Sequence, residues 1–567
     1  MDKKNLGLIL LTYIILSNFQ YMLVNSGGSI INSQFNTDSD VSVKISDAQY
    51  DCVDAWIIIG GDKSSHEYWE LVLLTLEWVY DQALALGNND NEILMLVPEV
   101  ALTHTSREYG DSSPTNLNYA FNTWAPDKVG PNGVLAVYLH DHGGNNAMAN
   151  HPYPSLTASE LDQYLDDFEA ASGCDRIIVV YEACSSGSFL DELSKSNRII
   201  MTSTEPGYSA WWSPIAPHIS LFGESLFNSI LAGNSIGDAF VDASNEINAL
   251  GYGGIQKPCI EDNHDGVGHI VNAWGHLPST GDGSDAKNTY LSQGCPPKLI
   301  QFPQIKFVPL KFWVAYNLTI INIPLSIGVD NSTGIASVIC RVIPEDWTPP
   351  EPRDNESMGG WDGNESLYQW ELTPDGNGNF TGSLAINSPI LNSNYLLSFF
   401  VKDVDGRRGQ VVSTQVGIND DGIAPVDNSN PIVIITNPNE NTGLKGVVNI
   451  TAEGDDDQAL DKIQIYLDGV LLKDESMPDY YPYPEVVHSI NTSDYNLGLH
   501  NITARAVDKT NNFQETTILV TFEEDKDTIP GFRITFLFTG TLVGIVTIII
   551  LYVKRNPVRK KKKIRKT

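Results

Sequence analysis

The sequence predicts a mostly parallel α/β sheet with helices on both faces, followed by two all-β sandwiches and one transmembrane helix. Strands and helices alternate over residues 52–275, short strands separated by Asn, Asp, Gly and Pro turns fill 300–525, and 534–553 holds 20 uncharged residues. Alternation of strands and helices is typical of a parallel sheet covered on both faces, whereas short strands without helical periodicity favour sandwiches.

The two ends of the chain predict its compartment. Residues 1–26 are typical of a secretory signal peptide, because two lysines precede an apolar stretch; an uncleaved anchor is the alternative. Residues 27–51 are rich in Ser and Asn and are expected to form a flexible leader. The segment 534–553 is long enough to cross about 30 Å of hydrocarbon, and the tail 554–567 follows with nine Lys and Arg. We therefore expect a single-pass protein of the cell membrane, with its N-terminal ectodomain outside and its tail in the cytoplasm.

The charge of the predicted ectodomain limits its partners. Between Lys4 and Lys554 the chain carries 24 Lys and Arg against 69 Asp and Glu. A net charge this negative repels phosphate backbones. We therefore expect no nucleic-acid partner.

The strands and helices of residues 52–275 can be placed from their apolar patterns. Five apolar runs predict strands at Trp56–Gly60, Glu92–Val97, Val134–Tyr138, Ile177–Tyr181 and Arg198–Thr202. Four amphipathic segments predict helices at 66–86, 157–172, 219–231 and 236–249. The second of these helices opens with Thr157-Ala-Ser-Glu160, the pattern of a capping box. A Gly/Ser/Asp-rich stretch, 276–299, is expected to be a linker.

Two polar motifs directly follow two of these strands. His140-Asp141-His142-Gly143-Gly144 follows the third strand, and Glu182-Ala-Cys184-Ser-Ser-Gly-Ser188 follows the fourth. Because the carboxyl ends of parallel strands meet at one sheet edge, an imidazole and a thiol are expected to lie together there, the arrangement for nucleophilic catalysis by cysteine. His142 is the expected base because Gly143 follows it directly, and His140 is the alternative. A buried structural thiol is the alternative for Cys184.

These motifs resemble the legumain family of cysteine peptidases, which belongs with the caspase-like peptidases and includes the catalytic subunit of the GPI-anchor transamidase. The likeness covers about 52–250. It implies a caspase/legumain-like fold, a Cys184–His142 dyad, hydrolysis or transfer of peptide bonds, and backbone oxyanion donors at Gly143 and Cys184. It implies no required cofactor.

The chain departs from this family at the substrate pocket. Legumain-like enzymes carry an Asn-x-Arg-His cluster after the first strand, where this chain has Lys63-Ser-Ser-His66, and an acidic residue after the nucleophile, where it has Ser185. We therefore expect no preference for Asn, and a small or basic residue at the cleavage site instead, the latter if Glu205 faces the pocket. The expected pocket residues are His66, Ser185, Ser203, Glu205 and Ser209.

The region 300–525 contains an internal repeat. Two alternating stretches about 105 residues apart are similar: Tyr395–Asp403 and His500–Asp508. Each precedes a turn and a further strand. We therefore expect two sandwiches, at 300–420 and 430–525. They resemble the Ig-like modules of surface proteins, so they are candidates for binding a surface partner. All eight N-x-[ST] sequons lie in this region, which makes it the candidate for glycosylation. They are Asn317, Asn331, Asn355, Asn364, Asn379, Asn449, Asn491 and Asn501.

Two further features concern calcium and disulfides. Glu261, Asn263 and Asp265 alternate before a glycine and resemble part of a calcium loop, although an ordinary Asx turn explains the pattern as well. A structural Ca²⁺ is the one cofactor that the sequence suggests. Six cysteines are present, and Cys259–Cys295 is the pair first expected to be bonded, because both flank the predicted linker.

Together these observations predict a membrane-anchored, cell-surface cysteine endopeptidase that acts on peptides or proteins through an acyl-enzyme. A transpeptidase, which uses the same dyad and passes the acyl group to an amine, is the first alternative. A non-catalytic adhesin is the second.

Overall fold

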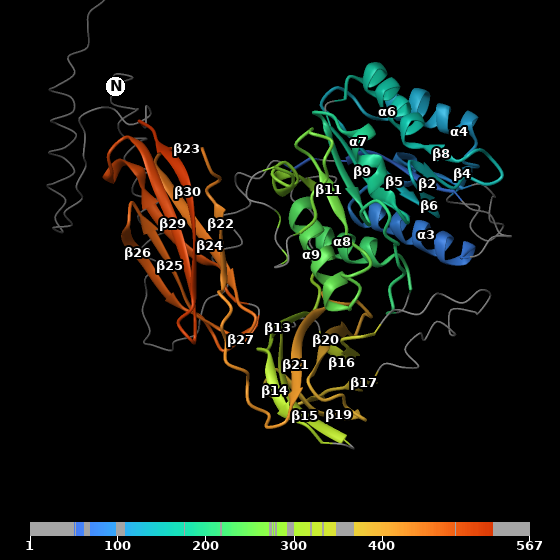
Figure 1. Cartoon of the computed structure of the whole chain (residues 1–567). Coiled ribbons are helices and arrows are strands. Elements are labelled where there is room, and N and C mark those ends of the chain that lie inside the picture. Colours follow the sequence, from blue (N-terminus) through green and yellow to red (C-terminus); the bar gives the residue numbers. More distant parts are fainter. Residues whose placement is uncertain are drawn as a thin grey trace, which may run out of the picture. The chain divides into compact units, whose positions relative to one another are not determined.

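The computed structural model describes most of residues 50–524. The described ranges are 50–51, 53–61, 68–97, 108–174, 176–215, 218–271, 275, 277, 281–291, 300–317, 320–330, 334–347, 368–481 and 483–524. The chain divides into two compact units, at Ile423/Ala424. The first unit holds the α/β domain and one sandwich, and the second holds the other sandwich (Figure 1).

The α/β domain is built on a mixed sheet with strand order β11-β10-β9-β5-β2-β3-β4. All neighbours in it are parallel except β10 and β11. Its strands are β2 (Val53–Gly60), β3 (Ile93–Leu96), β4 (Glu108–Gly110), β5 (Val134–His140), β9 (Arg176–Glu182), β10 (Arg198–Thr202) and β11 (Cys259–Glu261). The mostly parallel α/β sheet that the sequence predicts is therefore confirmed.

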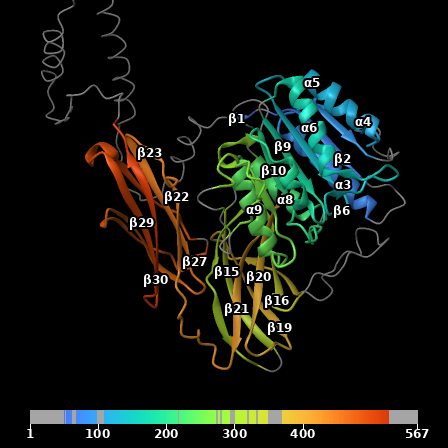
Figure 2. The ribbon, with the colours of Figure 1, turned by 45° about the horizontal axis from the view of Figure 1, so that its top comes forward.

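Helices cover both faces of this sheet, as Figures 1 and 2 show. One face packs on α3 (Trp69–Ala85), α8 (Leu221–Leu231) and α9 (Ile236–Ala249). The other packs on α4 (Pro114–Tyr119), the π-turn η2 (Ala120–Trp124), α5 (Ala125–Lys128), α6 (Ala158–Ser172) and α7 (Leu190–Leu193). The capping box predicted at Thr157 and Glu160 is present at the start of α6.

The apolar runs predict this arrangement because side chains alternate along a strand. In β5, Val134, Ala136 and Tyr138 face the first set of helices, while Leu135 and Val137 face the second. A strand buried on both faces needs apolar residues at successive positions, as these runs have.

Two parts of this domain differ from the sequence prediction. A small antiparallel sheet, β6 (Gly143–Gly144), β7 (Ala147–Met148) and β8 (Leu156–Thr157), follows β5. Within the predicted linker 276–299, residues 281–291 belong to the domain. They form η4 (Ala286–Asn288) and β12 (Tyr290–Leu291), which pairs with β1 (Tyr50–Asp51). The cause is Asp262, whose buried carboxylate accepts the N–H groups of Gly283 and Ala286 at 2.7 and 2.8 Å.

The first sandwich consists of two sheets, with orders β18-β19-β15-β13 and β14-β21-β20-β16-β17. Its strands are β13 (Gln304–Pro309), β14 (Phe312–Ala315), β15 (Ile320–Asp330), β16 (Ile335–Pro344), β17 (Tyr368–Glu371), β18 (Thr373–Pro374), β19 (Asn379–Asn387), β20 (Ser393–Asp403) and β21 (Val412–Asn419).

This sandwich shares a core with the α/β domain, which the separate domain bounds expected from the sequence do not anticipate. Phe400 and Val411 are buried in the same apolar cluster as α8 and α9. The Arg408 side chain, 5% exposed, lies within 3.0 Å of a Glu224 oxygen and 2.6 Å of a Glu246 oxygen. Packing against two helices makes the first sandwich part of the same compact unit as the α/β domain.

The second unit repeats the strand order of the first sandwich. Its sheets are β22-β24-β28 and β23-β30-β29-β25-β26. Strand β29 begins 105 residues after β20. In both sandwiches an edge strand pairs in parallel with the last strand: β14 with β21, and β23 with β30. The strands are β22 (Ile432–Asn437), β23 (Gly443–Leu444), β24 (Val447–Asp455), β25 (Leu460–Leu467), β26 (Val470–Ser476), β27 (Tyr480–Tyr481), β28 (Val486–Asn491), β29 (Gly498–Asp508) and β30 (Phe513–Phe522).

The predicted signal peptide, flexible leader, membrane segment 534–553 and basic tail lie outside the described residues. Among the residues that are described, no helix has the length and apolar character needed to span a bilayer.

Candidate active site

Cys184 lies on a tight turn at the carboxyl end of β9. The next residue, Ser185, has a left-handed φ of 56°, and its N–H donates to the Tyr208 carbonyl at 2.8 Å. Gly187 is required here, because a Cβ would lie 2.8 Å from the Thr204 carbonyl oxygen. A 3₁₀ turn, Ser186–Phe189, follows, and then only the four residues of α7. So short a helix contributes little of a helix dipole at this turn.

His142 enters from the end of β5, one residue after Asp141. The Asp141 carboxylate accepts the N–H groups of His142 at 2.6 Å and of Gly61 at 2.9 Å, which fixes the turn after the strand. A Cβ on Gly143 would lie 2.2 Å from the Cys184 carbonyl oxygen. Glycine therefore lets the backbone of the His motif approach the backbone of the nucleophile.

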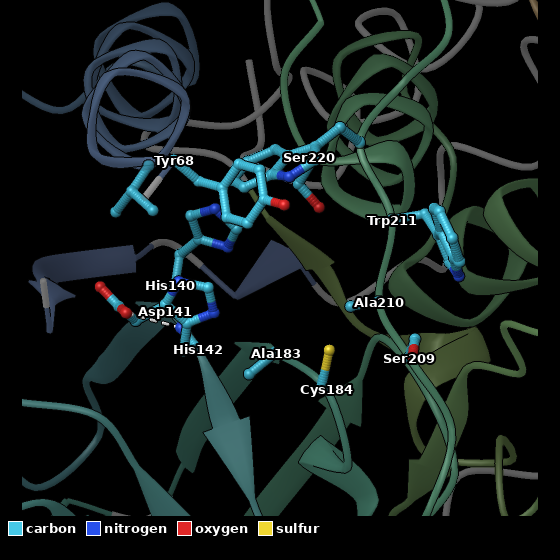
Figure 3. A pocket seen from close by; sticks show the side chains of 12 residues that line it. Tyr68, His140, Asp141, His142, Ala183, Cys184, Ser209, Ala210, Trp211 and Ser220 are labelled. Atoms are coloured by element: carbon cyan, nitrogen blue, oxygen red, sulfur yellow. Dashed lines mark hydrogen bonds between the residues drawn. The ribbon is translucent and has the colours of Figure 1, made fainter. Parts of the chain in front are cut away.

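His142 and Cys184 line one pocket, as predicted, and Figure 3 shows their side chains on the same cavity. The ring of Tyr68 lies 5.7 Å from that of His142, measured between centroids. The lining residues are Tyr68, Val72, His140, Asp141, His142, Ala183, Cys184, Ser209, Ala210, Trp211, Trp212 and Ser220. The sequence does not predict the aromatic residues of this pocket. The Trp211-Trp212 pair after the fifth strand was the available signal.

His140, the alternative base, is a buried member of the same pocket. It is 5% exposed, and its Nδ1 lies 3.1 Å from the Glu182 carbonyl oxygen. Its ring meets Trp212 edge-on at 4.9 Å. Burial lowers the pKa of His140 to about 3, so the ring is neutral at physiological pH. His142, which is exposed, is the imidazole that solvent and substrate can reach.

Glu182, two residues before the nucleophile, ties three elements together. Its carboxyl group accepts hydrogen bonds from Tyr138 Oη at 2.6 Å, from the Gly223 N–H at 3.1 Å and from Ser220 Oγ. It is fully buried, and burial raises its pKa to about 7. Glu182 therefore connects β5 and β9 to the start of α8.

The other expected pocket residues are only partly brought together. Ser209 lines the pocket, whereas Ser185, Ser203 and Glu205 are not among the described residues that line it. Ser203 is fully buried, and its Oγ accepts the Ala183 N–H at 3.2 Å. Glu205 pairs with Lys257 at 3.8 Å, so its charge is already countered. His66 lies outside the described residues.

The loop at Glu261 forms a hydrogen-bonded turn. Glu261 Oε1 accepts the N–H of His264 at 2.6 Å, and Asn263 Oδ1 accepts that of Asp265 at 2.9 Å. Calcium at this loop remains a prediction. Cys259 is a free, buried thiol rather than the expected disulfide partner, and burial raises its pKa to about 12. It lies in β11, an edge strand of the sheet.

Four sequon residues are exposed in the structure, and a fifth is half-buried. The exposed ones are Asn317, Asn449, Asn491 and Asn501, and the half-buried one is Asn379. Asn331, Asn355 and Asn364 lie outside the described residues. Glycosylation remains a prediction.

A thiol and an imidazole at the ends of neighbouring parallel strands, on one pocket, define a site of the cysteine-peptidase class. The comparisons with known proteins agree. Residues 127–242 match the model of the Peptidase C13 family and carry both motifs, so this part of the chain is a legumain-like C13 cysteine peptidase domain. Residues 431–504, in the second unit, match the model of the bacterial Ig domain.

Individual relatives are more distant. The vacuolar-processing enzyme of Ricinus communis is 25% identical over 181 residues, which are 30% of this chain and 35% of that enzyme. The chain thus spans about a third of this curated relative. Caspase-1 of Spodoptera frugiperda aligns at 16% identity over 38% of this chain and 86% of its own, with a TM-score of 0.26. The fibronectin(III)-like modules of Clostridium thermocellum CbhA align at 15% identity over 41% of this chain and 99% of their own, with a TM-score of 0.15.

Proposed function

We propose that the protein is a membrane-anchored cysteine endopeptidase in which Cys184 is the nucleophile and His142 the base. The observation that carries this proposal is the shared pocket of the two side chains within a C13 family domain. His142 takes the thiol proton, and the thiolate attacks the carbonyl carbon of the scissile bond. The proton then passes to the leaving amine, and a water molecule hydrolyses the resulting thioester.

The oxyanion of the tetrahedral intermediate is assigned to the N–H groups of Gly143 and Cys184. The close approach of the Gly143 backbone to Cys184 supports this assignment, because it brings the two backbone segments together beside the nucleophile. A substitution with a side chain at position 143 would separate the two segments and lower the rate.

The pocket supports a preference for an apolar side chain at the cleavage site. Tyr68, Trp211 and Trp212 supply aromatic walls, while Glu205, the group that would have favoured a basic residue, is paired with Lys257. Aromatic walls favour apolar surface through its burial. We retain the prediction that Asn is not preferred and replace the basic alternative by an apolar one.

Digestion of a peptide library by the full chain tests both proposals. Cys184→Ala is expected to abolish cleavage with the fold intact, and Cys174→Ala, which removes a buried thiol outside the pocket, is the matched control. Trp211→Ala is expected to broaden the preference. Full turnover by a folded Cys184→Ala protein would contradict the nucleophile. An added amine separates the alternatives, since a transpeptidase yields products that carry the amine mass.

Membrane anchoring is proposed from the 20 uncharged residues 534–553 and the basic tail after them. Protease applied to intact cells is expected to remove epitopes within 300–525 and to spare one placed after Lys554. The opposite pattern would overturn the orientation.

A further inference from the structure

Three carboxylates converge in the second unit, away from the peptidase site. Asp427 lies before β22, and Asp456 and Asp457 lie in the turn that joins β24 to β25. One oxygen from each lies within 4.8 Å of the other two. Segments almost thirty residues apart in the chain thus bring three like charges together.

One of the three carboxylates is buried and incompletely satisfied. Asp456 is 8% exposed, and its Oδ2 accepts the N–H groups of Gln458 at 2.9 Å and Ala459 at 2.7 Å. Its Oδ1 is shielded from solvent and has no hydrogen-bond partner among the residues that the structure describes. A buried acceptor left unpaired is destabilising, so a ligand that pairs with this oxygen would be favoured.

The electrostatic surroundings of Asp456 have the same sign as its own charge. Burial raises its pKa, and the neighbouring carboxylates of Asp427 and Asp457 raise it further. Asp457 is exposed, so a ligand can enter from its side. Ser429 holds the group in place, because its N–H donates to Asp427 Oδ1 at 2.9 Å and its Oγ to Asp457 Oδ2 at 3.2 Å.

We propose that Asp427, Asp456 and Asp457 bind a calcium ion in the second unit. Calcium takes six to eight hard oxygen ligands and tolerates irregular geometry, so three carboxylates and water suit it. The ion would neutralise the cluster and supply the missing partner of Asp456 Oδ1. It would also fix the segment before β22 onto the β24–β25 turn. This site is distinct from the predicted loop at Glu261 and from the peptidase site.

Terbium luminescence provides a direct test, because Tb³⁺ replaces Ca²⁺ and is excited through tyrosine. Tyr483 is close to the cluster: its Oη accepts the Leu460 N–H at 3.1 Å at the end of the same turn. All eleven tryptophans lie before Ile423, which leaves tyrosine as the sensitiser in the second unit. The full chain, stripped with EGTA, is expected to show tyrosine-sensitised emission that Ca²⁺ displaces at micromolar to millimolar concentration.

Variants assign the signal to these residues. Asp456→Asn is expected to weaken Ca²⁺ binding at least tenfold, while its amide oxygen can still accept the two turn N–H groups. Asp457→Asn, at an exposed position, should weaken binding without affecting the fold. Asp474→Asn, an exposed carboxylate of β26, is the matched control, and Asp265→Asn tests the other predicted loop. Neither control should change the emission.

Hydrogen exchange supplies an independent readout on the same protein. Ca²⁺ is expected to slow exchange in peptides covering 425–431 and 455–460 and to leave the peptides of β5 and β9 unchanged. The proposal is overturned if emission persists in Asp456→Asn and Asp457→Asn, or if millimolar Ca²⁺ neither displaces Tb³⁺ nor slows exchange in these peptides.

Discussion

The two sandwiches share one strand order but differ in their buried charges, which are of opposite sign in the first and of like sign in the second. In the first sandwich Arg408 reaches into the α/β domain and lies between Glu224 of α8 and Glu246 of α9. In the second, buried Asp456 lies beside two further carboxylates. The same fold thus serves in one place as a partner to a catalytic domain and in the other as a separate unit.

The difference follows from what each sandwich packs against. The first buries Phe400 and Val411 in the core of α8 and α9, so its charges must be matched within that core. The second has its own apolar core of 18 buried residues. Its acidic cluster lies outside that core, where an ion from solvent can supply the missing charge.

The largest expected effect concerns Arg408. Arg408→Met leaves Glu224 and Glu246 buried without their cation and should destabilise the first unit by about 3–5 kcal/mol. Urea unfolding followed by tryptophan fluorescence reports on this unit alone. Arg407→Met, at a half-buried neighbour paired with Asp405, should cost about 0–1 kcal/mol.

A second variant separates charge from packing. Replacing Arg408 by Met together with Gln at positions 224 and 246 removes all three charges, and much of the lost stability should return. A loss below about 1 kcal/mol in Arg408→Met alone would mean that the two acids are protonated or hydrated, and that the first sandwich is not held by this ion cluster.

Local patterns predicted the elements of the fold because they depend on neighbours in sequence. Apolar runs and one capping box located five strands and four helices near their observed positions, and the repeat of β20 and β29 gave the second sandwich. The fusion of the first sandwich with the α/β domain was missed. It depends on Arg408, Glu224 and Glu246, which are far apart in the sequence and look like ordinary surface charges.

The candidate site shows the same limit. Cys184 and His142 were predictable because each directly follows a strand, and strand ends meet at one sheet edge. The pocket walls were not, since Tyr68, Trp211 and Trp212 come from loops whose paths are set by tertiary packing. Glu205 was assigned to the pocket from its position after β10, but the ion pair with Lys257 takes its charge elsewhere.

The next effect in size concerns pH and the first unit. Glu182 has a folded pKa of about 7, above its value in an unfolded chain, because it is buried. The neutral form is favoured by folding, so the added stability is present at low pH and is lost as the pH rises through 7. Between pH 5 and pH 8 the first unit should lose about 2 kcal/mol from this group.

Glu182→Gln is the matched variant, because an amide keeps the shape and stays neutral. Its tryptophan-detected stability should vary less between pH 5 and pH 8 than that of the wild type. An equal slope in both proteins would assign the pH dependence to other groups. The second unit, followed by hydrogen exchange in the same samples, lacks Glu182 and should not respond to this substitution.

The smallest expected effect is that of Asp456→Asn, and it tests the difference between the two sandwiches most directly. Without a bound cation, Asp456→Asn removes one of three like charges in the second sandwich, so its stability should change by no more than about 0.5 kcal/mol or should rise slightly. The measurement is hydrogen exchange of peptides from β24 and β25 in EGTA. The expected change is far smaller than the loss in Arg408→Met, or of the opposite sign, although both substitutions remove one buried charge. In the first sandwich the charge removed is the one that neutralises its neighbours, whereas in the second it is one that repels them. If Asp456→Asn were as destabilising in EGTA as Arg408→Met, the carboxylate of Asp456 would have to be held by a cationic group of the chain, and the contrast between the two sandwiches would fail.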